Sequence, residues 1–349
     1  MAASTLQVEP APALPNGDHA EFVDVSEREL YVHSALPSQR ADALSLLYAA
    51  RTSRTRELVF RWAGGLKRRF PHLFLDLFVA ERAGEMAGAV WGMPASGRQV
   101  TVVPPVVVAD EPGSTKRELV AALDASLARD ETVQLASASL GCGSYDAPAM
   151  LANGFNYVTD IARLACVVGD AKVVGGESSL EFEPFQQSDI ERLKSILLRA
   201  SADSLDCPRL RGLRSIDDIY LAHVNRNGLV PSHWHIVRHD QQDVGCLLVS
   251  CHKNKTDCDV VYLGLVADAR GKGWGHTLIH RAIHIAQSTG ATRLFLDCDV
   301  HNPPAVKTYL AAGFREVERR SIFVKAYTWP TCQREQPGAR STDLAESAE

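Results

Sequence analysis

The sequence lacks several features that would assign the protein to a class at once. Its eight cysteines include no Cys-x-x-Cys pair, so their spacing favours neither a zinc site nor a disulfide framework, and we expect them to act as small apolar residues. The longest apolar runs, such as residues 102–108, have only strand length, which predicts no transmembrane helix. The first 21 residues lack the basic start and apolar core of a secretory signal. We therefore expect a cytoplasmic protein that does not bind membranes.

The formal net charge of -5 gives no overall attraction to nucleic acid, and three basic residues at 67–69 are too few to indicate a nucleic-acid surface. A hydrophobic content of 46% and 349 residues predict a folded chain of about two domains. We expect flexible tails at 1–21 and 329–349, with a Gly- and Ser-containing linker at 171–179. The two domains would then span residues 22–170 and 180–328.

Residues 259–314 contain the most informative pattern of the sequence. An apolar strand, a glycine turn, an amphipathic helix, a second strand and a second helix follow one another there. The turn has glycines at positions 271, 273 and 275, which allow a close backbone approach and leave N–H groups free to point at a ligand. Because a helix begins at this turn, its positive end faces the same point, so the pattern predicts an anion site suited to phosphate.

The two halves of the chain repeat each other. Gly154-Phe155 and Gly313-Phe314 end the similar strings MLANGF and YLAAGF, at an offset of 159 (313 − 154). An offset of this size indicates two copies of a whole domain. We expect a strand near residues 161–168 to close the first copy and a strand at 321–327 to complete the second.

The copies differ at the turn. Residues 270–275, Arg-Gly-Lys-Gly-Trp-Gly, align with residues 111–116, Glu-Pro-Gly-Ser-Thr-Lys. The first copy thus has an acidic residue in place of Arg270, and Pro112 removes a backbone N–H. The sequence predicts an intact anion site in the second copy and a defective one in the first.

These residues resemble the GNAT superfamily of acyl-CoA-dependent N-acyltransferases. The family's phosphate signature, Gln/Arg-x-x-Gly-x-Gly/Ala, is met by Arg270, Gly273 and Gly275, and its second signature by Asn302, Ala305, Tyr309 and Gly313-Phe314. The resemblance covers residues 180–328 closely and 22–170 weakly. One intact and one degenerate copy resemble the architecture of mycothiol synthase and its relatives within the superfamily.

The resemblance implies that acetyl-CoA is the acyl donor. The histidines show no metal-ligand spacing, so we expect no metal. Backbone N–H groups of residues 271–275 would hold the pyrophosphate, and the strand at 262–266 would pair with the pantetheine arm, as an added strand does. The residues expected to bind the cofactor are Leu265, Val266, Arg270, Gly271, Lys272, Gly273, Trp274, Gly275 and Asn302. Asn302 is also placed to cap the last helix, before Pro303.

The resemblance also implies a catalytic role for Tyr309, whose hydroxyl would protonate the departing thiolate. A general base must accept a proton from the amine, and three carboxylates are candidates. Asp259 begins the pantetheine strand, while Asp297 and Asp299 alternate on the next strand and share a face. The sequence does not decide among the three carboxylates, and a solvated charge at the end of a strand is the alternative interpretation of each.

Three other groups are weaker candidates. His233 and His235 project to one side of a predicted strand, but such a pair is more often a surface or packing feature. The loop at 204–208 occupies the place where the family shapes its acceptor site. Cys207 in this loop has no fixed base near it in sequence, which favours direct transfer over an acyl-enzyme.

The sequence therefore predicts two tandem α/β domains of the α+β type, each a twisted, mixed and mostly antiparallel sheet flanked by helices. The second domain would transfer acetyl to the primary amine of a small molecule, and the first would complete the acceptor site or stabilise its neighbour. The alternative is a non-catalytic acyl-CoA sensor that uses the same pocket to control a partner. Fold alone does not choose the acceptor.

Overall fold

The computed structural model describes the chain over five segments, which are residues 29–49, 74–170, 179–224, 233–251 and 256–327. The predicted tails at 1–21 and 329–349 lie outside these residues, and so does most of the predicted linker at 171–179. The first helix of the described residues runs from Arg40 to Leu47.

All the strands of the described segments belong to one twelve-stranded sheet, in the order β1-β2-β3-β4-β5-β12-β6-β11-β10-β9-β8-β7. Only the pairs β4–β5 and β10–β11 are parallel. The predicted mostly antiparallel α/β fold is therefore confirmed. The strands are β1 Leu30–Ser34, β2 Leu77–Arg82, β3 Glu85–Ala95, β4 Gln99–Val107, β5 Leu135–Gly141, β6 Asn156–Val167, β7 Glu181–Pro184, β8 Trp234–His239, β9 Gln242–Cys251, β10 Asp257–Leu265, β11 Arg293–Asp299 and β12 Arg315–Ala326.

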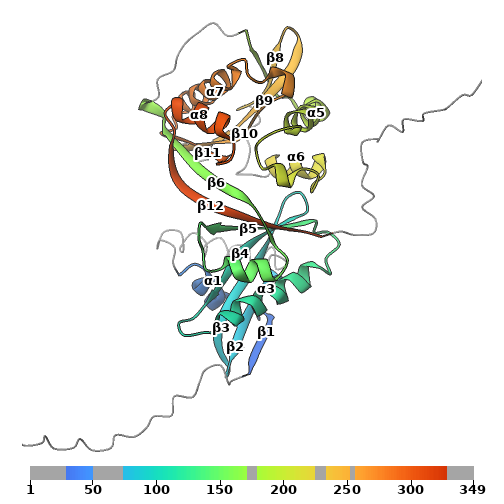
Figure 1. Cartoon of the computed structure of the whole chain (residues 1–349), viewed down its shortest axis with the longest axis vertical. Coiled ribbons are helices and arrows are strands. Elements are labelled where there is room, and N and C mark those ends of the chain that lie inside the picture. The colour runs from blue at the N-terminus through green and yellow to red at the C-terminus, as the bar shows by residue number, and fades with distance from the viewer. Residues whose placement is uncertain (1–28, 50–73, 171–178, 225–232, 252–255, 328–349) are drawn as a thin grey trace, which may run out of the picture.

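The same succession of elements occurs twice along the chain. The order β2-β3-β4-α3-β5-α4-β6 in the first unit recurs as β8-β9-β10-α7-β11-α8-β12 in the second. Figure 1 shows the two units stacked along the long axis, which confirms the tandem organisation. No helix of the described residues is long and apolar enough to cross a membrane. The helices are α1 Arg40–Leu47, α3 Gly113–Leu127, α4 Ala147–Ala152, α5 Ile190–Ser201, α6 Ile216–Val224, α7 Trp274–Ser288 and α8 Pro303–Ala311.

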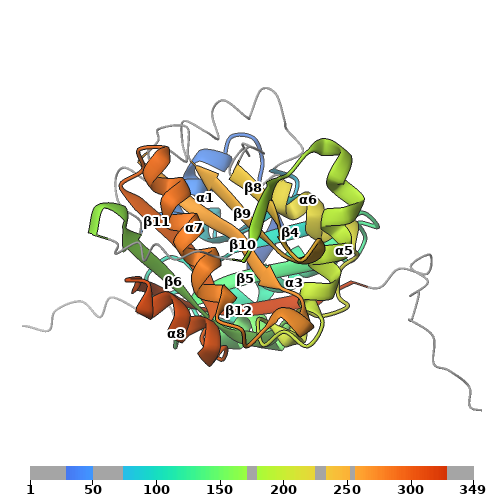
Figure 2. The ribbon, with the colours of Figure 1, turned by 90° about the horizontal axis from the view of Figure 1, so that it is seen from above.

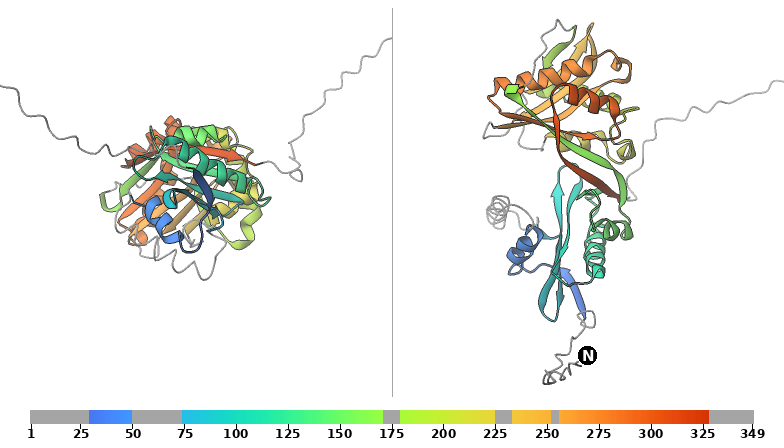
Figure 3. Two further views of the ribbon diagram at one scale, coloured as in Figure 1. Left: turned by 90° about the horizontal axis from the view of Figure 1, so that it is seen from below. Right: turned by 60° about the vertical axis from the view of Figure 1, so that its left-hand side comes forward.

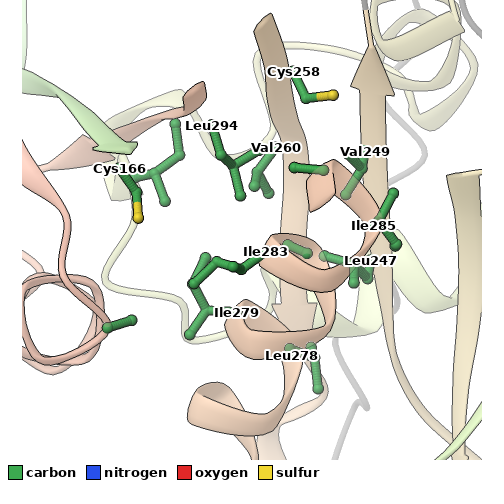
Figure 4. Close-up of a cluster of buried hydrophobic side chains, with 14 of the residues drawn as sticks. Cys166, Leu247, Val249, Cys258, Val260, Leu278, Ile279, Ile283, Ile285 and Leu294 are labelled. Atoms are coloured by element: carbon green, nitrogen blue, oxygen red, sulfur yellow. The ribbon is translucent and has the colours of Figure 1, made fainter. Parts of the chain in front are cut away.

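Helices cover both faces of each unit's part of the sheet. In the first unit α1 and α3 lie on opposite sides of the strands (Figure 3). In the second unit α7 and α8 pack on one side, and α5 and α6 on the other. The apolar residues of α7 recur at spacings of three and four, which gives the helix a single buried face. Figure 4 shows this face against the strands, and its buried residues are Leu278, Ile279, Ala282, Ile283, Ile285 and Ala286.

The last strands of the two units are exchanged. We predicted that each would close its own unit, and this is wrong. β12 of the second unit lies beside β5 of the first, with Ser321 opposite Leu140, and β6 of the first unit lies beside β11 of the second. The exchanged strands also pair with each other. Figure 1 shows them crossing between the units, and Figure 2 shows both strands in the view along the long axis. An alternating pattern identifies a strand but not the strand beside it, so the exchange could not be predicted from the sequence.

One pair of cysteines departs from the expectation of unpaired, apolar residues. Cys251 and Cys258 form a disulfide. They lie directly opposite each other on the antiparallel strands β9 and β10, so folding brings their side chains together. Five other cysteines in the described segments are free, and three of them, Cys166, Cys246 and Cys298, are buried as expected.

Candidate functional site

The sheet of the second unit opens between β10 and β11. These parallel strands pair only from Asp257 opposite Arg293 to Asp259 opposite Phe295. β10 continues to Leu265 and β11 to Asp299 without further pairing between them. A register shift between Val260 and Tyr262 on the β9 side marks the same place as a bulge. The backbone of β10 beyond Asp259 therefore has no partner strand on its β11 side.

The glycine turn lies at the end of this open strand. Gly271 and Gly273 have φ values of 77° and 79°, in the left-handed region that favours glycine. A Cβ atom added to either would meet nothing within 4 Å, so the turn faces open space. Gly273 directly precedes α7 and no side chain caps that helix, which leaves its first N–H groups without a side-chain acceptor. The turn thus combines free donors with the positive end of a fifteen-residue helix.

Leu265 and Val266 shape the entry to the turn. The Val266 N–H donates to the Val244 carbonyl at 3.0 Å, and the Val266 carbonyl accepts from the Ala269 N–H at 3.0 Å. The Leu265 carbonyl accepts from the Arg270 guanidinium at 3.1 Å. These bonds fix where β10 stops and where the turn begins.

Arg270 braces the turn against α5. Its guanidinium donates to the carbonyls of Ala200, Ala202 and Asp203, at 2.8, 3.0 and 3.2 Å. A cation at the carbonyl end of a helix is favourable, so this contact holds α5 in place. The side chain is engaged away from the free N–H groups of the turn, and any contact of Arg270 with a phosphate would come through its backbone.

Charged and aromatic side chains at the turn form a small cluster, in which Lys272 is exposed and Trp274 and His239 are half-buried. The Lys272 ammonium lies 4.8 Å from the centre of the Trp274 ring, and the His239 ring lies 4.6 Å from the same ring. Gly275 packs close to α8, because an added Cβ would lie 3.8 Å from Thr308. Lys272 is the cation best placed to add positive charge at the turn.

Asn302 caps α8, as predicted. Its side-chain oxygen accepts the Ala305 N–H at 3.3 Å, and Pro303 follows at the first helical position. Tyr309 lies two turns further along α8 and is half-buried against the core of the second unit. Within the described segments its hydroxyl makes no hydrogen bond. Burial raises the pKa of Tyr309, and nearby Cys298 and Asp206 raise it further, so the phenol keeps its proton at neutral pH.

The carboxylates predicted as bases are all engaged. Asp259 is 3% exposed and forms an ion pair with Arg163. Asp297 accepts from Arg163 at 3.2 Å and from Arg320 at 3.4 Å. Both carboxylates therefore already face a guanidinium group. Arg163 comes from β6 of the first unit, and only the strand exchange brings it here.

Asp299 is 1% exposed, and its carboxylate accepts three hydrogen bonds. It accepts the Thr159 hydroxyl at 2.7 Å, the His301 N–H at 2.8 Å and the Cys207 N–H at 3.0 Å. These bonds attach the end of β11 both to the first unit and to the loop that follows α5. Asp299 therefore holds the site together.

The loop after α5 supplies a carboxylate that sequence reasoning missed. Asp206 is exposed, and its Oδ1 accepts the Asp299 N–H at 3.3 Å. Tyr262, on the open part of β10, is half-buried with its ring against His223 and folded over Gly264, where an added Cβ would lie 2.7 Å from the Tyr262 hydroxyl. Loop residues show no periodicity that distinguishes one side chain from another. The only sign of Asp206 in the sequence was its position next to Cys207.

The histidines and Cys207 are not suited to proton transfer or attack. Burial lowers the pKa of His235 to about 4 and also lowers the pKa of His233. His235 is 5% exposed and packs edge-on against Phe182, which is a packing role. Burial and the charges of Asp206 and Asp299 raise the pKa of the Cys207 thiol, so it is no thiolate at neutral pH. These observations favour direct transfer.

The corresponding place in the first unit is built differently. Pro104 and Pro105 occupy the positions of Leu263 and Gly264 (263 − 159 and 264 − 159), and proline has no N–H to offer a ligand. Glu111, at the position of Arg270, accepts from Arg82 at 2.8 Å. A cavity of about 440 Å³ remains, lined by Val107, Glu111, Gly113, Lys116, Arg117, Tyr145, Pro148 and Ala149.

Comparison with known proteins agrees with this geometry. Residues 202–314 match the model of the Acetyltransferase (GNAT) family, and the glycine turn, the open strand pair and α8 all lie within them. The second unit contains a GNAT domain. No curated protein sequence matches the chain.

Solved structures show the same fold over most of the chain. A GCN5-related N-acetyltransferase from Sphaerobacter thermophilus superposes with a TM-score of 0.60 at 17% identity, over 85% of this chain and 95% of that one. A GCN5-related glucosamine N-acetyltransferase region of a fungal multi-domain GH3 beta-N-acetylglucosaminidase superposes with a TM-score of 0.57 at 14% identity. That match covers 90% of this chain and 40% of the fungal one. At these identities the likeness concerns the fold alone.

Proposed function

We propose that the GNAT domain transfers acetyl from acetyl-CoA to a primary amine of a small molecule. The observation that carries this proposal is the unpaired backbone of β10 beyond Asp259, which leads directly to the open turn at Gly271 and Gly273. A strand edge can pair with the amide-bearing pantetheine arm, and the free N–H groups before α7 can hold the pyrophosphate. Acetyl-CoA supplies the activated acetyl thioester.

Each cofactor-binding residue then has a defined role. Gly271, Lys272, Gly273, Trp274 and Gly275 surround the pyrophosphate. Leu265 and Val266 end the strand, Arg270 braces the turn against α5, and Asn302 opens α8 beside the pantetheine arm. The Arg270 contacts and the Asn302 cap described above support these roles.

Tyr309 donates the proton that the departing thiolate takes up. Its raised pKa keeps the hydroxyl protonated at neutral pH, and no hydrogen bond within the described residues holds that proton elsewhere. A proton-accepting role for Asp259 or Asp297 stays a prediction, and their ion pairs with Arg163 weigh against it.

The first unit shapes the acceptor side. The turn between β3 and β4 docks on α6, where Arg98 forms a fork with the 4% exposed Asp218, at 2.8 Å to Oδ2 and 3.2 Å to Oδ1. Gly97 is required at this contact, since an added Cβ would lie 2.2 Å from the Asp218 carbonyl oxygen. We propose residues 22–170 and 180–328 as the boundaries of the two units, with one active site in the second.

The test is a screen for release of free CoA from acetyl-CoA against a library of primary amines. Gly273→Asp, which places a carboxylate in the turn, should weaken acetyl-CoA binding on the order of 100-fold in calorimetry, by like-charge repulsion. Ser114→Asp, on the first unit's α3, and Gly290→Asp, at a similar φ of 75° in an open turn, should leave the affinity unchanged.

Equal loss of affinity in Gly273→Asp and Ser114→Asp would refute the assignment of the intact site to the second unit. Binding of acetyl-CoA without CoA release for any amine would indicate a sensor instead of an enzyme.

A further inference from the structure

A strained loop holds Asp206 at the open end of the strand pair. Asp203 and Cys207 have φ values of 52° and 46°, which non-glycine residues seldom adopt. Asp206 accepts the Asp299 N–H, and the Cys207 N–H donates back to the Asp299 carboxylate at 3.0 Å. The loop is thus fixed to β11 where that strand no longer pairs with β10. Backbone strain maintained by surrounding contacts is concentrated at functional sites.

Asp206 differs from Asp259 and Asp297 in having no cationic partner among the described residues, since those two share Arg163. It differs from Asp299 in accepting one hydrogen bond where Asp299 accepts three. The arginines that follow Asp206 are engaged elsewhere. Arg209 donates to the Tyr157 carbonyl at 2.7 Å, and Arg211 donates to the Ser204 carbonyl at 2.8 Å. The Asp206 carboxylate is therefore both accessible and uncompensated.

The groups around Asp206 increase its basicity. It reaches solvent on one side but is surrounded by protein on the others, and this burial raises its pKa, opposed in part by the Asp299 N–H. The charges of Asp299 and Asp297 raise it further. Among the described residues, Asp206 raises the pKa of four further groups, which are neutral at pH 7: Tyr262 on β10, Tyr309 on α8, Cys298 on β11 and Cys207 in the same loop.

We propose that Asp206 receives the ammonium group of the acceptor and accepts its proton, as the general base of the transfer. This inference rests on the proposed acetyltransferase function and narrows the acceptor to amines that are cationic at neutral pH. Asp206 lies at the opening between β10 and β11, on the loop between α5 and α6, so the acceptor enters from that side. The exposed face of the carboxyl returns the proton to solvent.

The protons and electrons balance as follows. The ammonium gives one proton to Asp206, which becomes a neutral acid and then releases that proton to water. The freed amine forms a C–N bond with the thioester carbonyl carbon, and the C–S bond breaks with its electron pair on sulfur. Tyr309 gives its hydroxyl proton to the sulfur, and the second proton of the nitrogen restores the phenol. The products are an amide, free CoA and one proton.

The experiment compares Asp206→Asn with Asp203→Asn, an exposed aspartate of the same loop whose backbone contact to Arg270 is unaffected. With n-butylamine and with the best amine of the library, Asp206→Asn should lower kcat by about 100- to 1,000-fold. Its affinity for acetyl-CoA should change less than about threefold, since the Asp206 side chain bonds to β11 and not to the turn. The kcat of wild type should fall in acid around the Asp206 pKa, above the ordinary value near 3.9, because the carboxylate form is required.

The assignment is overturned if Asp206→Asn keeps wild-type kcat and its acid limb, or if Asp203→Asn loses as much. A second measurement needs no amine. The carboxyl carbon of Asp206, identified in NMR spectra by its absence from the Asn variant, should titrate above about 3.9 in the wild-type protein. A midpoint at or below that value overturns the assignment even if no amine is acetylated, so the failure of the two proposals can be told apart.

Discussion

Arg163 offers the sharpest test of how the two units are joined. It extends from β6 of the first unit to Asp259 and Asp297 of the second. Arg163→Met keeps most of the side-chain volume but removes the charge. The Asp259 side chain is only 4% exposed, so the variant leaves a buried carboxylate without this partner.

Removing one partner of a buried ion pair costs about 3–5 kcal/mol. The Arg163 side chain is 23% exposed and so partly hydrated. We therefore expect Arg163→Met to lower the free energy of unfolding by about 3 kcal/mol, near the lower end of that range. The double variant Arg163→Met/Asp259→Asn also removes the carboxylate charge that the single variant leaves unpaired. It should therefore recover roughly half of the lost free energy of unfolding.

The assay is urea unfolding of the full chain, followed in parallel by tryptophan fluorescence and circular dichroism. The matched control is Arg293→Met. Like Arg163, Arg293 packs on the Phe295 ring, and its guanidinium forms a bidentate pair with Asp257 of β10. Because the Arg293 side chain is 53% exposed, its loss should cost no more than about 1 kcal/mol. Equal costs for the two single variants, or additive losses in the double variant, would refute the reasoning.

Two further predictions concern the site. Tyr309→Phe should lower kcat by about 100-fold with little change in the KM for acetyl-CoA, because it removes only a proton donor, and steady-state kinetics at saturating amine measures this. Arg98→Ala should raise the KM of the amine severalfold while acetyl-CoA affinity stays constant, since it frees α6 and leaves the glycine turn intact; an unchanged KM for the amine would count against a role of the first unit in the acceptor site.

The local structure of the second unit was predictable from sequence because its signals are local. A continuous apolar run marks β10, spacings of three and four mark α7, and the glycines between them mark a turn with positive φ values. Asn302 before Pro303 marked the start of α8 in the same way. The defective anion site of the first unit was also predicted from the sequence, although Pro104 and Pro105 are a stronger sign of it than Pro112.

What the sequence did not predict depends on contacts between distant residues. Arg163 lies 96 positions before Asp259, and no pattern links them until β6 is placed beside β11. That contact gives Asp259 and Asp297, two of the candidate bases, a shared arginine partner that no sequence pattern indicated. Asp206 lies in a loop, where neither period nor propensity distinguishes one aspartate from another. The Cys251–Cys258 disulfide likewise follows from strand register and not from spacing.

The exchange of β6 and β12 has a consequence for how the chain is made. Leu140 of β5 pairs with Ser321, which is 181 residues later (321 − 140). At ribosomal rates of 5–20 residues per second, the edge of β5 stays without its partner strand β12 for roughly 10 to 40 s. During synthesis the first unit is an open sheet whose unpaired edge is a template for wrong partners. The protein therefore reaches its native state only near the end of translation, and chaperones that shield strand edges should matter most in that interval.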